Sequence, residues 1–181
     1  MRNAFLSLLL LLVLLTACVT RQPAQTSVAA PQLPDSVQQV YNRLFLEGVC
    51  QMQSTHYDAA YDLFKEAIRL NPQASEAYFE LGLMLLQSDK KTGESGLPLL
   101  ERAVQLAPDN EDYLLALIRA YLGADEMAKM EPLCQRLLAK RYSEPTCEML
   151  YYSFIKQEKY EEAIRVIDRM EQHEGEATDE S

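Results

Sequence analysis

The chain has 181 residues, with 17 Lys and Arg against 27 Asp and Glu and a net charge of −10. Nucleic-acid binding requires a basic surface that neutralises phosphates, and this acidic sequence offers none. The chain has no Trp, only six Gly, and many Leu and Ala, which favours an all-α protein. The roughly 140 residues that follow a Pro-rich stretch have the length of one domain.

The first residues, MRNAFLSLLLLLVLLTAC, form an uncharged run from Ala4 to Ala17 behind Arg2. The run is short for a bilayer span, which requires roughly 20 residues. It is typical of the hydrophobic region of a secretory signal, so we expect a signal peptide over residues 1–17. The alternative is an uncleaved membrane helix that happens to end in Cys18.

The end of this run, Leu15-Thr16-Ala17-Cys18, resembles the lipobox of bacterial lipoproteins. The resemblance implies that Cys18 becomes the mature N-terminus and carries acyl chains such as palmitate; two or more chains hold a protein stably at a membrane. Val19 stands where Asp would retain such a protein in the inner membrane. The same resemblance therefore implies an outer-membrane anchor, with the protein facing the periplasm.

Two segments of the sequence read as unstructured. Residues 18–35 are rich in Gln, Pro, Ala, Thr and Ser, which is typical of a flexible linker, here attached to the lipid anchor. At the other end, acidic residues without Lys or Arg predict a disordered tail over residues 174–181.

A repeated apolar pattern occupies the segment between them. Residues 57–72 align with residues 95–108, and apolar or small side chains recur at spacings of four and three, which places them on one helical face. The four copies of this face are Ala60, Phe64 and Ala67; Gly96, Leu100 and Ala103; Met130, Cys134 and Leu137; and Ala163, Ile167 and Met170.

Each copy follows another apolar helical pattern. Gly48 and Gly82 lie in these preceding segments, and we expect them to face Ala60 and Gly96, so that paired helices approach closely. The remaining core positions of the preceding helices are Leu44; Tyr78, Leu81 and Leu85; Leu114, Leu117 and Tyr121; and Cys147, Leu150, Tyr151 and Phe154.

These positions resemble the tetratricopeptide repeat, a helix-turn-helix unit of about 34 residues. The resemblance covers residues 36–173 and implies an all-α, right-handed α-α superhelix of four units, at about 41–74, 75–110, 111–143 and 144–173. It is weakest in the third unit, where Met130, Leu137 and Tyr142 replace two small residues and a Pro. Pro98 and Pro132 occupy equivalent sites and predict that both of their helices start late.

In such arrays the first helix of each unit lines the concave side, which here is mostly apolar. Its polar members would be Asn42, Glu76, Asp112 and Glu148. The predicted partner-binding residues of this groove are Phe45, Val49, Met52, Phe79, Leu83, Leu86, Leu115, Arg119, Leu122, Tyr152 and Ile155. Phe45 and Val49 stand where chaperone-binding relatives carry Lys and Asn, so recognition of a C-terminal carboxylate is not expected.

The predicted function is a membrane-anchored scaffold whose groove binds an apolar peptide or an amphipathic helix of another envelope protein. Alternatively the chain covers its own groove, or it is the first section of a longer array whose later repeats fill it. Glu171 takes the outward position held by Ile68, Val104 and Leu138 in earlier units, and a polar outer face is what a terminal repeat needs. Ile164 and Val166 still flank that face, which leaves the last alternative open. The general resemblance also includes pilotins and lipoproteins that assist outer-membrane protein assembly.

The sequence predicts no enzyme, metal or cofactor. His56 and His173 lie at opposite ends of the array, and the usual catalytic and phosphate-binding motifs are absent from the sequence. The spacing of Cys50, Cys134 and Cys147 matches no metal or redox motif, so we expect buried thiols. A Cys134–Cys147 disulfide is the less favoured alternative.

Overall fold

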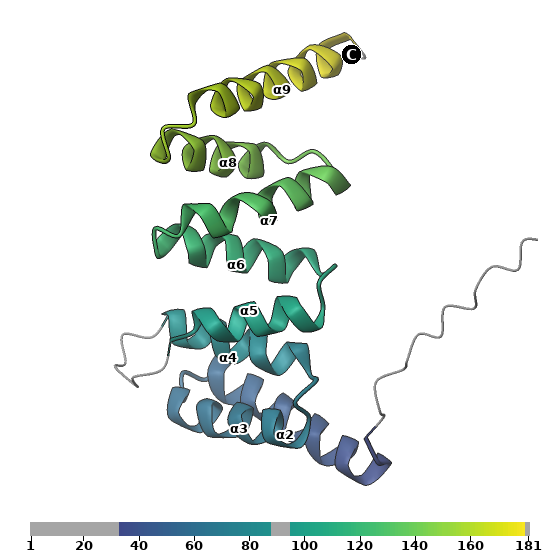
Figure 1. The fold of residues 1–181 in the computed structure, drawn as a ribbon. Helices are drawn as coiled ribbons and strands as arrows, with labels where there is room; N and C mark the ends of the chain where they lie inside the picture. The colour runs from purple at the N-terminus through teal and green to yellow at the C-terminus, as the bar shows by residue number, and fades with distance from the viewer. Residues whose placement is uncertain (1–32, 88–94, 180–181) are drawn as a thin grey trace, which may run out of the picture. The chain divides into compact units, whose positions relative to one another are not determined.

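The computed structural model describes residues 33–87 and 95–179, with side chains described as far as residue 175. Within these ranges the chain forms eight α-helices and no strand, as predicted (Figure 1). The helices are α2 (Asp35–Gln53), α3 (Tyr57–Leu70), α4 (Ser75–Gln87), α5 (Leu97–Leu106), α6 (Glu111–Gly123), α7 (Met127–Lys140), α8 (Glu144–Lys156) and α9 (Tyr160–Asp179). The proposed signal peptide, Cys18 and most of the predicted linker lie outside the described residues.

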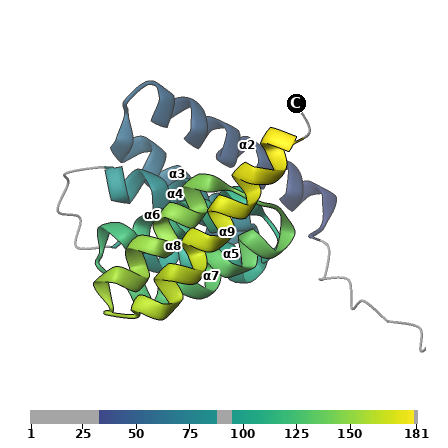
Figure 2. The same cartoon turned by 90° about the horizontal axis from the view of Figure 1, so that it is seen from above.

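Each helix packs against the next one along the chain, from α2 to α9. The helices therefore stack as an α-solenoid of helix pairs, and Figure 2 shows the same stack along its length. In addition α4 contacts both α2 and α6, the first helices of the neighbouring pairs. This layering places α2, α4, α6 and α8 in equivalent positions.

The second helices bury the faces that their spacing predicted. Ala60, Phe64, Ala67, Leu100, Ala103, Met130, Cys134 and Leu137 are all buried, which confirms the first three copies of the pattern. In α9 the prediction is wrong at Ile167, which is 39% exposed, whereas Val166 is buried in its place. No described helix covers the outer side of α9, so only the positions that turn toward α8 are buried.

Close approach between paired helices is confirmed at Gly82 and Gly96. A Cβ atom on Gly96 would collide with the carbonyl oxygen of Gly82, so the α4 and α5 backbones touch at this point. Gly48 makes room differently from the prediction, because the ring of Phe64 rather than Ala60 lies closest to it. A Cβ on Gly48 would come within 2.8 Å of Phe64 Cε1.

The first helices follow the predicted core with local corrections. Tyr41 is 2% exposed, while the predicted Leu44 is only half-buried. Tyr41 is held there because its hydroxyl donates a 2.7 Å hydrogen bond to Glu76 and its ring stacks on Phe45. Tyr78 is half-buried and Tyr151 is 37% exposed, so neither belongs to the core.

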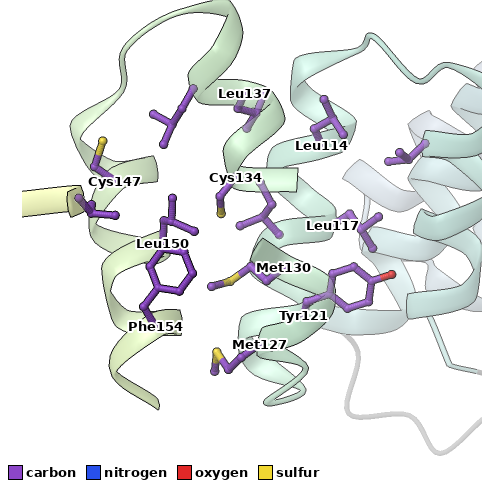
Figure 3. Close-up of a cluster of buried hydrophobic side chains, with 14 of the residues drawn as sticks. Leu114, Leu117, Tyr121, Met127, Met130, Cys134, Leu137, Cys147, Leu150 and Phe154 are labelled. Carbon is purple, nitrogen blue, oxygen red and sulfur yellow. The ribbon is translucent and has the colours of Figure 1, made fainter. Parts of the chain in front are cut away.

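The largest buried cluster among the described residues is centred on α6, α7 and α8 and extends to α5 and α9 (Figure 3). Cys134 and Cys147 both belong to it and are free thiols, which confirms that they are buried cysteines rather than a disulfide. The expectation is wrong for Cys50, which is exposed near the end of α2. Burial, the largest cause, raises the pKa of the Cys134 thiol to about 12.

The two prolines behave differently. Pro98 lies in the first turn of α5, a helix of 10 residues that starts late as predicted. The prediction is wrong for Pro132, because α7 begins at Met127 and continues through it. The Pro132 ring is exposed, whereas Met127 and Met130 in the first turn of α7 are buried. Packing of these two methionines in the core therefore keeps the first turn helical, although Pro132 disfavours helix before it.

The turns within three of the helix pairs share one geometry that the sequence did not suggest. Thr55, Asp125 and Glu158 all adopt a positive φ, between 59° and 63°. The next residue in each turn donates its N–H to the carbonyl five residues earlier, as in His56 to Gln51. This arrangement caps α2, α6 and α8 in the same way and sets the reversal into the second helix.

The C-terminal segment differs from the predicted disordered tail, because α9 continues as a helix to Asp179. Two contacts hold its later turns against the preceding pair. Arg169 Nη2 donates to the carbonyl oxygen of Leu138 at 2.8 Å, and the His173 ring stacks on Tyr142 with centroids 3.6 Å apart. The residues that follow, such as Glu174 and Glu176, are compatible with a helix.

Candidate partner-binding groove

A cavity of about 890 Å³ lies between α4 and α6. It contains five of the residues predicted for the concave groove, and it also reaches Ser95 and Leu97 at the start of α5. The five are Phe79, Leu83 and Leu86 of α4 and Leu115 and Arg119 of α6. Equivalent helices of adjacent pairs therefore form the two walls, and we call this cavity the α4–α6 groove.

The α4 wall is apolar because α4 carries apolar side chains both on its core-facing side and on its groove-facing side. Leu81 and Leu85 turn inward and are buried, while Phe79, Leu83 and Leu86 follow one another at spacings of four and three on the other side. The Phe79 ring stacks on Tyr113 of α6 with centroids 4.4 Å apart, which fixes its orientation. Leu86 remains 45% exposed, so the groove presents an apolar side chain that the described chain leaves uncovered.

The α6 wall combines small residues with two charges. Ala116, Ala120 and Gly123 line the groove without filling it. Asp112 lies at one end of this wall and Arg119 lies nearer its middle, seven residues further on, which corresponds to roughly 10 Å along a helix. Within the described part of the chain, neither side chain forms a hydrogen bond or an ion pair. The groove therefore offers an apolar floor with one unpaired anion and one unpaired cation.

Two further carboxylates of α4 lie beside the groove but are not part of its lining. Glu76 is engaged by the hydroxyl of Tyr41. Burial raises the pKa of the half-buried Glu80 carboxyl above its usual range. Burial also raises the pKa of Tyr113, the partner of Phe79 in the stack.

The other predicted groove residues lie outside this cavity. Phe45, Val49 and Met52 of α2 are half-buried and pack against the core beneath α3 and α4. Leu122 packs against the cluster of α6, α7 and α8. Tyr152 and Ile155 are exposed on α8, 44% and 38% respectively, with the Lys156 ammonium 5.8 Å from the centre of the Tyr152 ring.

Sequence reasoning missed the residues that shape the groove without contributing bulk. Ala116, Ala120 and Gly123 recur at spacings of four and three along α6, and this stripe of small residues was a usable signal. Leu97 precedes Pro98 at the start of α5, and its position depends on where that helix begins. No periodicity in the sequence predicts that position.

The histidines and the acidic residues are dispersed. His56 is exposed in the turn after α2, with its Nδ1 2.9 Å from Gln51 Oε1, and His173 lies on Tyr142 near the end of α9. Among the described residues, no three His, Cys, Asp or Glu side chains gather closely enough to hold a metal ion. None of the helices in the described ranges has the length and apolar character of a membrane span.

Comparison with known proteins gives the same fold. Residues 47–111 match the family model of the tetratricopeptide repeat. No curated protein sequence matches the chain. A crystal structure of MamA superposes with a TM-score of 0.62 at 16% identity, covering 72% of this chain and 71% of MamA. A MamA segment from Desulfovibrio magneticus RS-1 superposes with a TM-score of 0.56 at 20% identity, covering 75% and 76% of the two chains.

A third similar structure is YrrB, described as a tetratricopeptide-repeat protein with an unusual peptide-binding site. It superposes with a TM-score of 0.59 at 13% identity, covering 73% of this chain and 71% of YrrB. Structural similarity at sequence identities this low supports a shared fold and does not support a shared function. The family match over residues 47–111 and the shared architecture together show that the fold of this chain is an all-α solenoid of the tetratricopeptide-repeat type.

Proposed function

We propose that this protein is a lipid-anchored scaffold of the bacterial envelope that binds a segment of another envelope protein in the α4–α6 groove. The solenoid fold belongs to a class of protein–protein interaction scaffolds. The α4–α6 groove carries the proposal, because its Leu86 is 45% exposed and the side chains of Asp112 and Arg119 have no hydrogen-bond or ion-pair partner within the described chain. Acylation at Cys18 would hold the protein at the outer membrane, facing the periplasm.

The mechanism that follows is tethering. A lipid anchor confines the groove to one membrane surface, and confinement raises the local concentration of whatever the groove holds. The residues between Cys18 and α2 would supply the distance from the membrane. The scaffold then brings its partner to the membrane, and the proposal requires no chemical step.

Photocrosslinking tests the groove directly. A photoreactive phenylalanine analogue in place of Phe79 is expected to capture one partner reproducibly in cells, because this ring lies in the groove wall. Leu83→Glu with Leu115→Glu should remove the captured product, since buried carboxylates would oppose an apolar ligand. The same analogue at Tyr160, an aromatic residue of α9 that is 59% exposed, is the matched control.

Two outcomes would contradict the groove proposal. One is capture of nothing but this chain itself from position 79, which would favour self-covering of the groove. The other is a product at position 79 that survives both glutamate substitutions with its yield unchanged. Circular dichroism of the double variant checks that the helices remain folded.

Anchoring has its own test. Cys18→Ser is expected to abolish incorporation of labelled palmitate and to release the protein from the membrane fraction, because no acyl acceptor remains. Cys50→Ser, at an exposed cysteine within the helical array, should leave both properties unchanged. A Cys18→Ser protein that still sediments with membranes as the same processed species would show that the lipid anchor is wrong.

A further inference from the structure

We infer that the α4–α6 groove selects an amphipathic helix that carries an acidic residue and, seven residues later, a basic residue, and that this helix lies antiparallel to α6. The inference rests on the proposed function, since it specifies the ligand of the same groove. Three observations carry it: the polarity of the lining, the direction of the cavity, and the spacing of its two unpaired charges.

The lining favours a helix over an extended segment. Among the described residues, only Gln87 and Ser95 contribute polar side chains to the groove apart from Asp112 and Arg119. An extended peptide would place its backbone N–H and C=O groups against an apolar floor, where each unpaired group is costly. A helix satisfies these groups internally and presents only its apolar face to Phe79, Leu83 and Leu115.

The cavity is also elongated along the axes of α4 and α6, as a bound helix between them would be. Its lining extends along α6 from Asp112 to Ala124, about 18 Å of helix, and along α4 from Phe79 to Gln87. A bound helix would therefore lie in the furrow between two helices, with room provided by Ala116, Ala120 and Gly123. The exposed Leu86 would be covered by the ligand.

Charge complementarity then sets the sequence and direction of the ligand. The Arg119 guanidinium favours a carboxylate, with which it can form two parallel hydrogen bonds, and Asp112 favours a cation. The two sites are seven residues apart on α6, so a helix alongside meets both with residues at i and i+7. An antiparallel ligand has its acid nearer its own N-terminus and its base nearer its C-terminus, the order that its helix dipole also favours.

The test is a selection of displayed peptides on the full chain. The library holds amphipathic 15-residue helices with Glu, Lys and Ala varied at positions i and i+7 of the polar margin. Wild type is expected to enrich Glu at i with Lys at i+7, and a retained peptide should bind about tenfold more tightly than its charge-swapped counterpart. Asp112→Arg with Arg119→Glu should reverse the order, and Asp112→Asn with Arg119→Gln should remove the preference while peptides are still retained.

The matched control exchanges one acidic and one basic residue of a helix outside the groove. Glu66 and Arg69 of α3 pair at 2.6 Å on the exposed side of that helix, so Glu66→Arg with Arg69→Glu should select the same peptides as wild type. The inference would be overturned if the retained peptides showed no preferred charges at i and i+7, or if every variant selected the same charges at these positions. Either result would leave the groove proposal standing. If no protein retains any peptide, the groove proposal itself fails.

Discussion

Gly96→Ala is expected to lower the free energy of unfolding by about 3 kcal/mol. A Cβ at this position would collide with the carbonyl oxygen of Gly82, and it would lie 2.9 Å from Leu86 Cγ and 3.1 Å from Leu86 N. Two of these three atoms belong to the backbone of α4, which cannot yield by rotating a side chain. The helices α4 and α5 would have to separate, which also displaces the α4 wall of the groove.

Urea unfolding followed by circular dichroism at 222 nm measures this effect as a lower midpoint. Gly123→Ala is the matched control, because no described atom beyond the adjoining residues and backbone of α6 lies within 4 Å of the position that its Cβ would occupy. Replacing Gly by Ala near the end of α6 should raise stability by a few tenths of a kcal/mol, since Gly loses more backbone entropy on folding. A Gly96→Ala protein with the wild-type midpoint would mean that α4 and α5 do not touch at Gly82.

The same glycine contact shows why the fold could be predicted from this sequence. Gly48 and Gly82 lie in the first helices at the positions where these helices were expected to meet their partners. The apolar pattern of the helix pair then recurred at a regular interval along the chain. In a repeat protein the same structural position occurs once in every unit, so an apolar residue that is present in only one unit can be recognised as accidental. The interior second helices, with Phe64, Leu100 and Cys134, were therefore predicted correctly.

Errors occur where this comparison between units fails. Ile167 and Val166 differ by one residue, or 100° around the helix, and only the presence or absence of a neighbouring helix decides which one is buried. Tyr41 replaces Leu44 in the core because its hydroxyl finds Glu76, a contact between residues 35 positions apart. Such pairings depend on tertiary distances that helical periodicity does not contain.

The sequence predicted that an apolar groove exists, but it did not predict which of the helices form its walls. The resemblance to the repeat family indicated that first helices line the concave side, and spacing then identified the side chains of α4 and α6 that face the groove, including Phe79 and Arg119. It also assigned Phe45 and Met52 to an open surface, although both pack against the core. The width of a groove depends on how far adjacent pairs rotate against each other, and this rotation is set by the packing of many side chains together.

Alkaline pH is expected to destabilise the fold steeply, because buried acids, among them Cys134, Tyr41 and Tyr121, hold their protons in the folded state. Burial raises the pKa of Cys134 from its ordinary value near 9.0 to about 12. Burial, followed by hydrogen bonds to Glu76 and Glu101, raises the pKa of Tyr41 and Tyr121 far above 10.0. Each group ionises in the unfolded chain first, so its contribution is complete below the unfolded pKa and is lost as pH rises toward the folded one.

The loss begins near pH 9 with Cys134 and steepens above pH 10, when both tyrosines ionise in the unfolded chain. Each such group costs about 1.4 kcal/mol per pH unit. Urea midpoints between pH 7 and pH 11 measure the slope. Cys134→Ala should flatten it from pH 9, and Tyr41→Phe from pH 10, although both variants start from lower stability at pH 7. Cys50→Ser, at an exposed thiol, should keep the wild-type slope. Identical slopes in all four proteins would mean that Cys134 and Tyr41 titrate alike in the folded and unfolded chains, and that neither acid is buried as the structure describes.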